Sequence, residues 1–351
     1  KWHWYSWLGF GGCYLLMMFY TTVSGWMLHY FYLTATGKFT GLDSETVSEQ
    51  FNTMLSQPLV MGFWMVVVVI AGILVCSIGL QNGLEKVTKV MMISLLLIMI
   101  VLAVNSFFMD GAKEGLSFYL IPDFGRMKEI GIIKTITGAM NQAFFTLSLG
   151  IGAMAIFGSY IGKERSLLGE SLNIALLDTF VAITSGLIIF PACFTFNVDQ
   201  TSGPGLIFIT LPNIFNHIPM GRLWGSLFFV FMSFAAFSTI LAVFENIMSF
   251  CMDMFGWNRN KAALVNGIII LIASLPCVLG YNVWSNLHLI GGRDVLDSED
   301  FIVSNLLLPI GSLVYLLFCV TKWGWGFDNY LEEANTGKGI KIARRLKPYF
   351  Q

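Results

Sequence analysis

The stretch NQAFFTLSLGIGAMAIFGSY, residues 141–160, has the composition of a membrane helix but an oxygen-rich centre broken by glycines. Gly150 and Gly152 follow Thr146 and Ser148, and each glycine costs about 1 kcal/mol relative to alanine inside a helix. Irregular backbone at membrane depth persists only where it is buried in protein or lines a cavity. A broken helix offers free carbonyls to a cation and free amides to an anionic group. Since hydroxyl oxygens are ligands that a small hard cation prefers, the stretch predicts a cation site.

The alternative for this stretch is a glycine-rich packing seam, because small residues let membrane helices approach closely. A seam explains less well an oxygen-rich cluster confined to the centre of the run. A second cluster lies in SFAAFSTILAVFEN, residues 233–246. There Ala235, Ser238 and Thr239 fall within about one helical turn, so their oxygens can share a face. The alternative for the second cluster is that the hydroxyls bond back to their own helix.

Two acidic residues, Asp178 and Glu245, fall clearly inside apolar runs. A carboxylate within a membrane span is costly, and by default it indicates function. The alternative is a structural hydrogen bond to a neighbouring helix. For Asp178 the functional interpretation is favoured, whereas for Glu245, nearer the cytoplasmic end of its run, both interpretations stay open.

The elements that must position these groups are membrane helices. The chain is 56% hydrophobic and only 12% charged, and a soluble domain carries about twice that charge. Apolar runs of the roughly 20 residues that span a bilayer predict eight spanning helices. They lie at about residues 8–33, 58–80, 88–108, 131–160, 172–195, 222–252, 261–280 and 303–321.

Several classes of protein are excluded or disfavoured. The net charge of −1, without a basic cluster, argues against a nucleic-acid partner. All six cysteines fall in apolar runs without metal-ligand spacing, which indicates buried thiols. The sequence has no nucleotide-binding loop, no HExxH and no His/Cys cluster, so we do not expect an enzyme. It also lacks a TVGYG-like filter or a ring of acids, which disfavours a channel.

The distribution of basic residues predicts the orientation. Thirteen of the 20 Lys and Arg residues lie in loops 81–89, 162–170 and 253–261 and at the two ends of the chain, and basic residues concentrate on the cytoplasmic side. We therefore expect a multi-pass protein of the cell membrane, of the bacterial inner-membrane type, with both ends cytoplasmic. Because the chain does not begin with Met and its first run starts almost at once, we also expect a piece of a longer protein.

Five motifs resemble the neurotransmitter:sodium symporter family, in particular its bacterial amino-acid transporter branch. In chain order they are GLQNGLEKVTKVMM, GLSFYLIPDF, QAFFTLSLGIGAM, TSGPGLIFITLP and DFIVSNLLLPIG. The resemblance implies an all-α integral membrane protein built as two inverted repeats of five helices. The eight runs look like helices three to ten, with the first two helices and a C-terminal helix missing. Residues 1–108 would then be the rest of the first repeat, 109–130 an external loop, 131–327 the second repeat and 328–351 a basic cytoplasmic tail.

The resemblance also implies roles for single residues. Substrate contacts are implied for Tyr20, Phe145, Thr146, Ser148, Ile151 and Val243. Sodium ligands are implied for Thr146, Asp178, Ala235, Ser238 and Thr239, and gate residues for Asp300, Asp253 and Tyr160. Asp178 falls where relatives carry an asparagine ligand. Its fixed charge would replace chloride, because a charge at about 4 Å matters strongly in a low dielectric, so we expect that chloride is not required.

These assignments imply a sodium-coupled symporter of amino acids that works by alternating access, with sodium ions as cofactors and the lipid bilayer as its surroundings. The alternative is a non-transporting sensor or partner protein of the same family. The retained cation ligands argue against a sensor, which need not keep them. Since the family's first helix supplies part of the sodium and substrate sites, we expect the 351-residue chain alone to bind substrate poorly. The sequence indicates neither the particular amino acid nor the oligomeric state.

Overall fold

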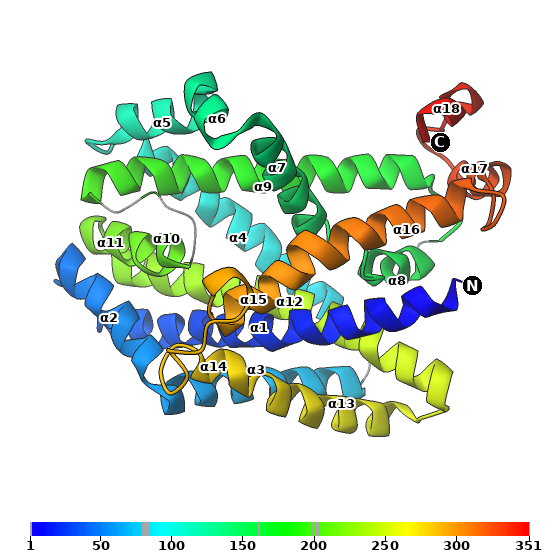
Figure 1. Ribbon diagram of the computed structural model, residues 1–351. Coiled ribbons are helices and arrows are strands. Elements are labelled where there is room, and N and C mark those ends of the chain that lie inside the picture. Colours follow the sequence, from blue (N-terminus) through cyan, green and yellow to red (C-terminus); the bar gives the residue numbers. More distant parts are fainter. Residues whose placement is uncertain (1, 79–83, 161, 198–199, 201–203, 351) are drawn as a thin grey trace. The chain divides into compact units, whose positions relative to one another are not determined.

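The computed structural model describes residues 2–78, 84–160, 162–197, 200 and 204–350 (Figure 1). Within these residues the regular structure is helical, apart from one isolated parallel bridge between Arg165 and Lys338. The α-helices are α1 (His3–Ala35), α2 (Ser44–Ser56), α3 (Pro58–Ile78), α4 (Leu84–Ser106), α5 (Ala112–Leu120), α6 (Phe124–Ile130), α7 (Ile132–Thr146), α8 (Ala153–Tyr160), α9 (Leu167–Phe196), α10 (Gly205–Phe208), α11 (Thr210–His217), α12 (Gly221–Phe255), α13 (Arg259–Ala273), α14 (Leu275–Leu279), α15 (Val295–Ile302), α16 (Leu308–Val320), α17 (Phe327–Ala334) and α18 (Lys347–Phe350). Short 3₁₀ helices cover Ile290–Gly292 (η1) and Arg344–Leu346 (η3), and a π-helix, η2, covers Val303–Leu307.

Five helical stretches in the described part of the chain are long and apolar enough to cross a membrane. They are Pro58–Ile78, Leu167–Phe196, Gly221–Phe255, Arg259–Leu279 and Val295–Val320. They coincide with five of the eight predicted runs. The other three runs correspond to α1, to α4 and to the pair α7 and α8, which are not among these five stretches. Of these helices, α7 with 15 residues and α8 with 8 are each shorter than the roughly 20 residues of a span. The count of eight spans therefore stays a prediction.

Local signals set the ends of the long helices. Gly256, at φ 64°, ends α12 in the left-handed conformation that glycine favours. Two residues later the Asn258 side chain caps α13 by accepting a hydrogen bond from the Lys261 amide at 2.9 Å. The turn between α12 and α13 is consequently only three residues long, 256–258. The segments between predicted runs at 34–57, 109–130 and 196–221 contain the short helices α2, α5, α6, α10 and α11.

The chain forms two compact units, each made of separate stretches. Unit 1 comprises Lys1–Leu16, Gly125–Phe180 and Glu299–Gln351, and unit 2 comprises Met17–Phe124 and Val181–Ser298. In unit 1, α7 packs against α16 and η2. The two predicted inverted repeats are defined by the order and direction of the helices along the chain. The two compact units are defined by contacts and do not test that order, so the two repeats stay a prediction.

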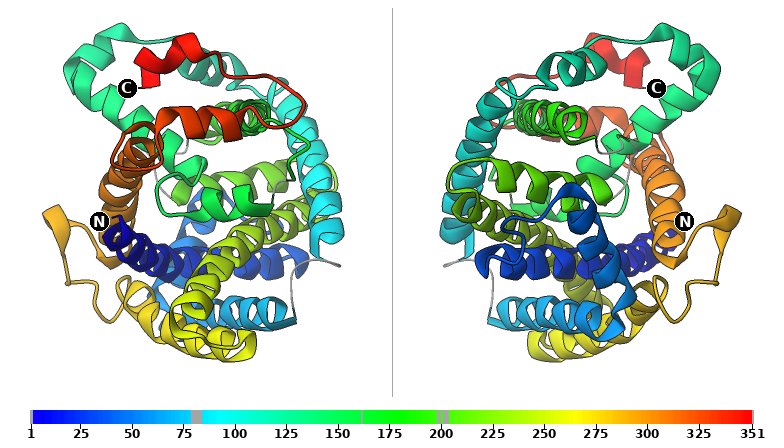
Figure 2. Two further views of the ribbon diagram at one scale, coloured as in Figure 1. Left: turned by 90° about the vertical axis from the view of Figure 1, so that its right-hand side faces the viewer. Right: turned by 90° about the vertical axis from the view of Figure 1, so that its left-hand side faces the viewer.

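Unit 2 is organised around α12, which packs against α3, α4, α11 and α13. Helices α3 and α13 lie side by side in both views of Figure 2. Close approach of α1 to α3 depends on Gly25, where a Cβ atom would lie 2.8 Å from the Met65 amide nitrogen. Buried aromatic rings fill the space beside α1, with Tyr30 and Phe208 centroids 4.8 Å apart. This packing holds α1 and α12, the two helices of unit 2 that carry candidate site residues.

Candidate functional site

The predicted break in the stretch 141–160 is present in unit 1. Helix α7 ends at Thr146 and α8 begins at Ala153. Between them Ser148, Gly150 and Gly152 have φ angles of 50°, 91° and 94°. A non-glycine residue with positive φ is uncommon, so Ser148 marks a backbone that its surroundings hold in place.

Contacts within unit 1 account for the glycine of the break. The Tyr5 hydroxyl donates a hydrogen bond to the Gly150 carbonyl. A Cβ atom on Gly150 would lie 2.3 Å from the Leu308 carbonyl oxygen, and one on Gly311 would lie 2.1 Å from the Gly150 oxygen. The broken backbone therefore packs directly on α16. The helix break and the glycine packing seam, which the sequence presented as alternatives, are one feature.

Thr146 and Asp178, two predicted sodium ligands, are hydrogen-bonded to each other. The Thr146 hydroxyl donates to a carboxylate oxygen of Asp178 at 2.7 Å, from the end of α7 to the middle of α9. Asp178 is half-buried, as are Phe145 and Ser148 beside Thr146 in the chain. A hydroxyl and a carboxylate beside the irregular backbone that follows α7 offer the oxygens that a hard cation takes.

Ile151, a predicted substrate contact, is only 3% exposed. Its Cγ2 atom lies 3.4 Å from where a Cβ atom of Gly12 in α1 would be, and its carbonyl faces the Cys13 thiol at 3.5 Å. Within unit 1 the Ile151 side chain therefore packs against α1.

The predicted gate residues have different surroundings. Asp300 in α15 is half-buried and accepts a hydrogen bond from the Ser304 hydroxyl at 2.7 Å. Asp253 is exposed in the last turn of α12. Tyr160 ends α8, and its side chain lies outside the described part of the structure.

One polar pair in unit 1 was missed by the sequence analysis. The Asn141 side-chain amide donates to the Asn305 carbonyl oxygen, which joins α7 to η2. Two asparagines in predicted spans are a usable signal, because polar side chains within membranes tend to bond across helices. The sequence does not show which helices meet.

In unit 2 the predicted residues of α12 lie on one stretch of helix. The Ser238 hydroxyl donates to the Ala235 carbonyl at 2.7 Å, so the back-bonding alternative holds for this serine. The Thr239 side chain lies close to the hydroxyl of Tyr20 on α1. Val243, one turn further, is 2% exposed. Tyr20 and Thr239, which the sequence assigned to different ligands, are therefore direct neighbours.

Glu245 is explained by an ion pair. Its carboxylate, 8% exposed, receives hydrogen bonds from two guanidinium nitrogens of Arg259 at 3.0 and 2.5 Å. Arg259 also donates from Nε to the Cys76 carbonyl at 2.7 Å. This is the structural interpretation left open for Glu245. The sequence analysis missed the partner because Arg259 lies outside the apolar run, at the first position of α13, and its long side chain reaches inward.

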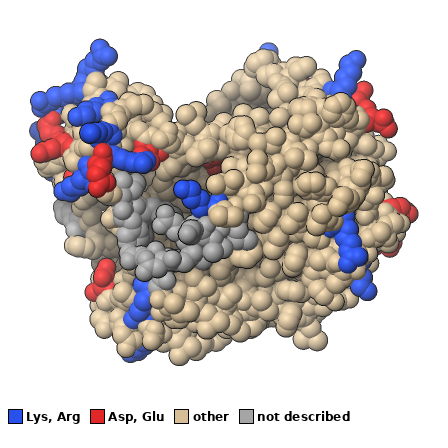
Figure 3. Space-filling view, turned by 180° about the vertical axis from the view of Figure 1, so that it is seen from behind, with Lys and Arg blue, Asp and Glu red and all other residues tan. Residues whose placement is uncertain are grey.

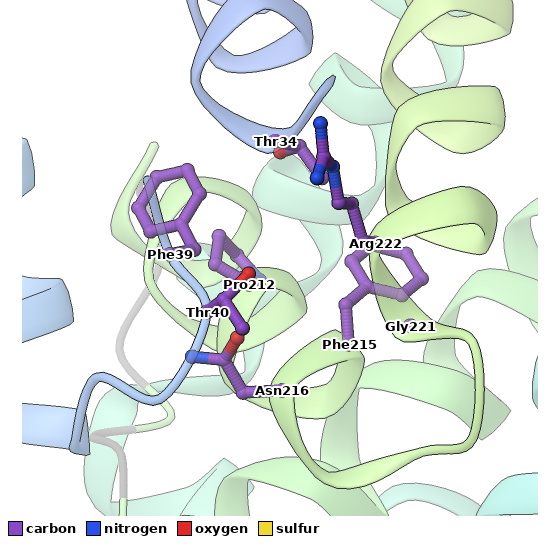
Figure 4. A pocket seen from close by; sticks show the side chains of 8 residues that line it. All are labelled: Thr34, Phe39, Thr40, Pro212, Phe215, Asn216, Gly221 and Arg222. Atoms are coloured by element: carbon purple, nitrogen blue, oxygen red, sulfur yellow. The ribbon is translucent and has the colours of Figure 1, made fainter. Parts of the chain in front are cut away.

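A small polar pocket in unit 2 has a structural role. It is lined by Thr34, Phe39, Thr40, Pro212, Phe215, Asn216, Gly221 and Arg222 (Figure 4). Its volume is about 20 Å³, room for about one water molecule and too little for an amino acid. The Arg222 guanidinium donates from Nε to the Ala35 carbonyl at 2.9 Å, and the Asn216 amide donates to the Leu42 carbonyl at 3.2 Å. Both bonds fasten the turn after α1 to the α11–α12 corner.

The helix break, its hydroxyl–carboxylate pair and the five apolar helices define a class of protein: an all-helical, multi-pass membrane protein with a discontinuous helix, as in many secondary transporters. The model of the Sodium:neurotransmitter symporter family matches residues 46–344. The chain belongs to this family.

Individual relatives agree with this assignment. The chain is 35% identical to the sodium-dependent transporter YhdH of Bacillus subtilis (strain 168), over 92% of this chain and 70% of YhdH. It is 27% identical to the sodium-dependent transporter MJ1319 of Methanocaldococcus jannaschii, over 97% of this chain and 69% of MJ1319. Among solved structures it is similar to MhsT in complex with L-phenylalanine, with a TM-score of 0.90 and 35% identity over 97% of this chain and 76% of MhsT. The resemblance to the family inferred from the five motifs is thereby confirmed.

Proposed function

We propose that the chain carries the sodium and substrate machinery of a symporter that couples amino-acid uptake to the sodium gradient by alternating access. The observation that carries this proposal is the hydrogen bond of 2.7 Å between Thr146 and Asp178 at the helix break. Sodium needs a nearly complete oxygen shell, and this pair supplies a hydroxyl and a carboxylate beside irregular backbone. Ala235, Ser238 and Thr239 of α12 are proposed as ligands of a second sodium ion.

Amino acids are the proposed substrates. MhsT was solved with L-phenylalanine, and relatives from Drosophila that are 25–26% identical are described as sodium-dependent nutrient amino acid transporters. In unit 1 we propose Phe145, Thr146, Ser148 and Ile151 as substrate contacts. In unit 2 we propose Tyr20, whose hydroxyl would meet the substrate carboxylate, and Val243 as an apolar wall.

The remaining expectations are part of the same proposal. Eight spans would cross the bacterial inner membrane, arranged as helices three to ten of the family's two inverted repeats. Asp300, Asp253 and Tyr160 would act at the outer and inner gates. Chloride would not be required, because the charge of Asp178 takes its place. These assignments rest on the resemblance of the motifs to those of the family.

The test is uptake of radiolabelled L-phenylalanine into proteoliposomes that contain the complete carrier. Uptake should need an inward sodium gradient and should vanish when choline replaces sodium. Thr146→Ala removes one oxygen from the proposed sodium shell and should raise the sodium concentration for half-maximal uptake at least tenfold, a loss of about 1.4 kcal/mol in binding free energy.

The matched control is Thr137→Ala in the same helix, whose hydroxyl bonds to the Ile133 carbonyl of its own helix at 2.8 Å. This variant should keep the sodium dependence of the parent. Uptake that is equally fast in choline, or an unchanged sodium dependence in Thr146→Ala, would contradict the proposal.

A further inference from the structure

The segment after α17, residues 335–346, lies in the predicted basic tail and is folded, and we call it the strap. One side chain joins residues 335 and 342 of the strap. The Asn335 amide donates to the Ile342 carbonyl at 2.9 Å, and the Ile342 amide donates back to the Asn335 side-chain oxygen at 2.7 Å. Ile342 is only 5% exposed. The strap is therefore a closed loop with one buried anchor.

The strap is also bonded to the segment that links α8 and α9, in the same unit. The Lys338 amide donates to the Glu164 carbonyl at 2.8 Å, and the Ser166 amide donates to the Lys338 carbonyl at 3.1 Å. The Ser166 hydroxyl reaches the next turn and donates to the Ile340 carbonyl at 2.8 Å. Gly337 has a φ of 86°, and a Cβ atom there would lie 2.6 Å from the Arg165 amide nitrogen. The glycine, the bridge and the serine together fix the course of the strap.

The charges that the strap holds in place are all positive. The strap and the next residue, Lys347, together contain five Lys and Arg residues and no Asp or Glu. Arg344 pairs with Asp328 at 2.9 Å, and the Lys347 ammonium lies 5.7 Å from the Phe327 ring centroid. The other three are exposed, and no acid of the described part of the chain lies within ion-pair distance of them: Lys338, Lys341 and Arg345. Figure 3 shows Lys and Arg side chains gathered at one upper corner, with Asp and Glu side chains among them.

Large apolar side chains are exposed within the strap and at residues near it in the sequence. Ile340 is 56% exposed, Leu346 42%, Tyr349 85% and Trp323 88%. Trp323 lies three residues after Val320, the last residue of α16 and the end of a candidate membrane span. Exposed Trp and Tyr beside cations at the end of a span are typical of the interface between lipid and water. These exposed apolar side chains therefore favour contact with lipid over contact with water alone.

We propose that the strap is a docking surface for the headgroups of anionic phospholipids in the surrounding bilayer. Lys338, Lys341 and Arg345 bind the phosphates, because ammonium and guanidinium groups without an acidic partner form charge-assisted hydrogen bonds to phosphate oxygens. Ile340 and Leu346 enter the boundary of the acyl chains. The charges select an anionic lipid over a zwitterionic one, and the apolar side chains select a lipid over a free phosphate ion.

The rigid strap also distinguishes this surface from a flexible basic tail. Its backbone is held by hydrogen bonds, so little backbone freedom is lost when lipids bind. Each cation near an anionic membrane surface contributes about a fivefold gain in affinity. The three unpaired cations together should give a preference on the order of a hundredfold for anionic lipid.

The experiment compares lipid binding by the detergent-purified protein and by a variant with Lys338→Gln, Lys341→Gln and Arg345→Gln. The probes are phosphatidylglycerol and phosphatidylcholine, counted on the intact protein by native mass spectrometry, with inorganic phosphate as a third arm. The control variant carries Lys113→Gln, Lys128→Gln and Lys134→Gln, three exposed lysines far from the strap in the chain. It has the same net charge as the strap variant.

We expect preferential binding of phosphatidylglycerol by the parent and the control, and loss of that preference in the strap variant alone. Equal loss in both variants would mean that net charge, and not the strap, attracts the lipid, and would overturn the proposal. So would an unchanged preference in the strap variant, or inorganic phosphate that displaces the lipid completely, which would indicate a phosphate-ion site instead.

Discussion

Asp178 combines two roles in the proposed sodium site, since it accepts the Thr146 hydroxyl and brings a negative charge next to the helix break. If this charge takes the place of chloride, uptake should persist when gluconate replaces chloride. Asp178→Asn keeps the shape of the side chain and removes its charge, so uptake by this variant should fall at least tenfold and should be stimulated by chloride. The measurement is sodium-driven uptake in the two anions. Parent uptake that collapses in gluconate would refute this role of Asp178.

The ion pair between Glu245 and Arg259 should contribute to the stability of the fold. Arg259→Gln leaves a nearly buried carboxylate without its cation, which should cost about 3 kcal/mol of stability. Thermal unfolding can be followed with a thiol-reactive dye, because five of the six cysteines are buried. The control is Arg344→Gln, from an exposed pair with Asp328, which should cost less than about 1 kcal/mol. If Arg259→Gln and Arg344→Gln lowered the unfolding temperature equally, the buried ion pair would contribute no more to stability than the exposed one, which would contradict this prediction.

At the scale of elements, the break between α7 and α8 depends on backbone that only glycine adopts easily. Gly150→Ala should destabilise the protein by at least about 2 kcal/mol, because a left-handed alanine is strained and its Cβ atom meets the Leu308 carbonyl at 2.3 Å. Gly138→Ala in α7 is the matched control. A Cβ atom there meets nothing within 4 Å, so this variant should gain about 0.5–1 kcal/mol from better helix propensity. Thermal unfolding of both variants tests the contrast, and a harmless Gly150→Ala would argue against a rigid break.

At the scale of the whole molecule, the bridge between Arg165 and Lys338 joins two distant parts of the chain, so both parts should lie on the same side of the membrane. Lys163→Cys and Lys341→Cys should therefore react with a membrane-impermeant thiol reagent from the same side. Lys128→Cys, before α7, should react from the opposite side if α7 and α8 together cross the bilayer. Labelling in right-side-out and inverted vesicles measures this. Opposite labelling of Lys163→Cys and Lys341→Cys would exclude the strap as described.

Most of the elements could be predicted from the sequence because their signals are local. Long apolar runs predict membrane helices wherever they occur. Five predicted spans coincide with helices of the structure that are long and apolar enough to cross a membrane. The break at residues 147–152 was predictable because glycines beside hydroxyl residues weaken a helix regardless of its neighbours. The family was recognisable because five short motifs occur in order along the chain.

Which residues meet was decided only by the tertiary structure. A helix that is apolar all round carries no stripe to show which face meets which neighbour. The sequence alone therefore left Glu245 without Arg259 and did not join Asn141 to Asn305. It also gave residues 328–351 only as a basic cytoplasmic tail and did not show that Ser166, 174 residues before Ile340, holds the strap by a hydrogen bond. Such contacts form only once the helices have packed, because packing brings together backbone and side chains that no local pattern connects.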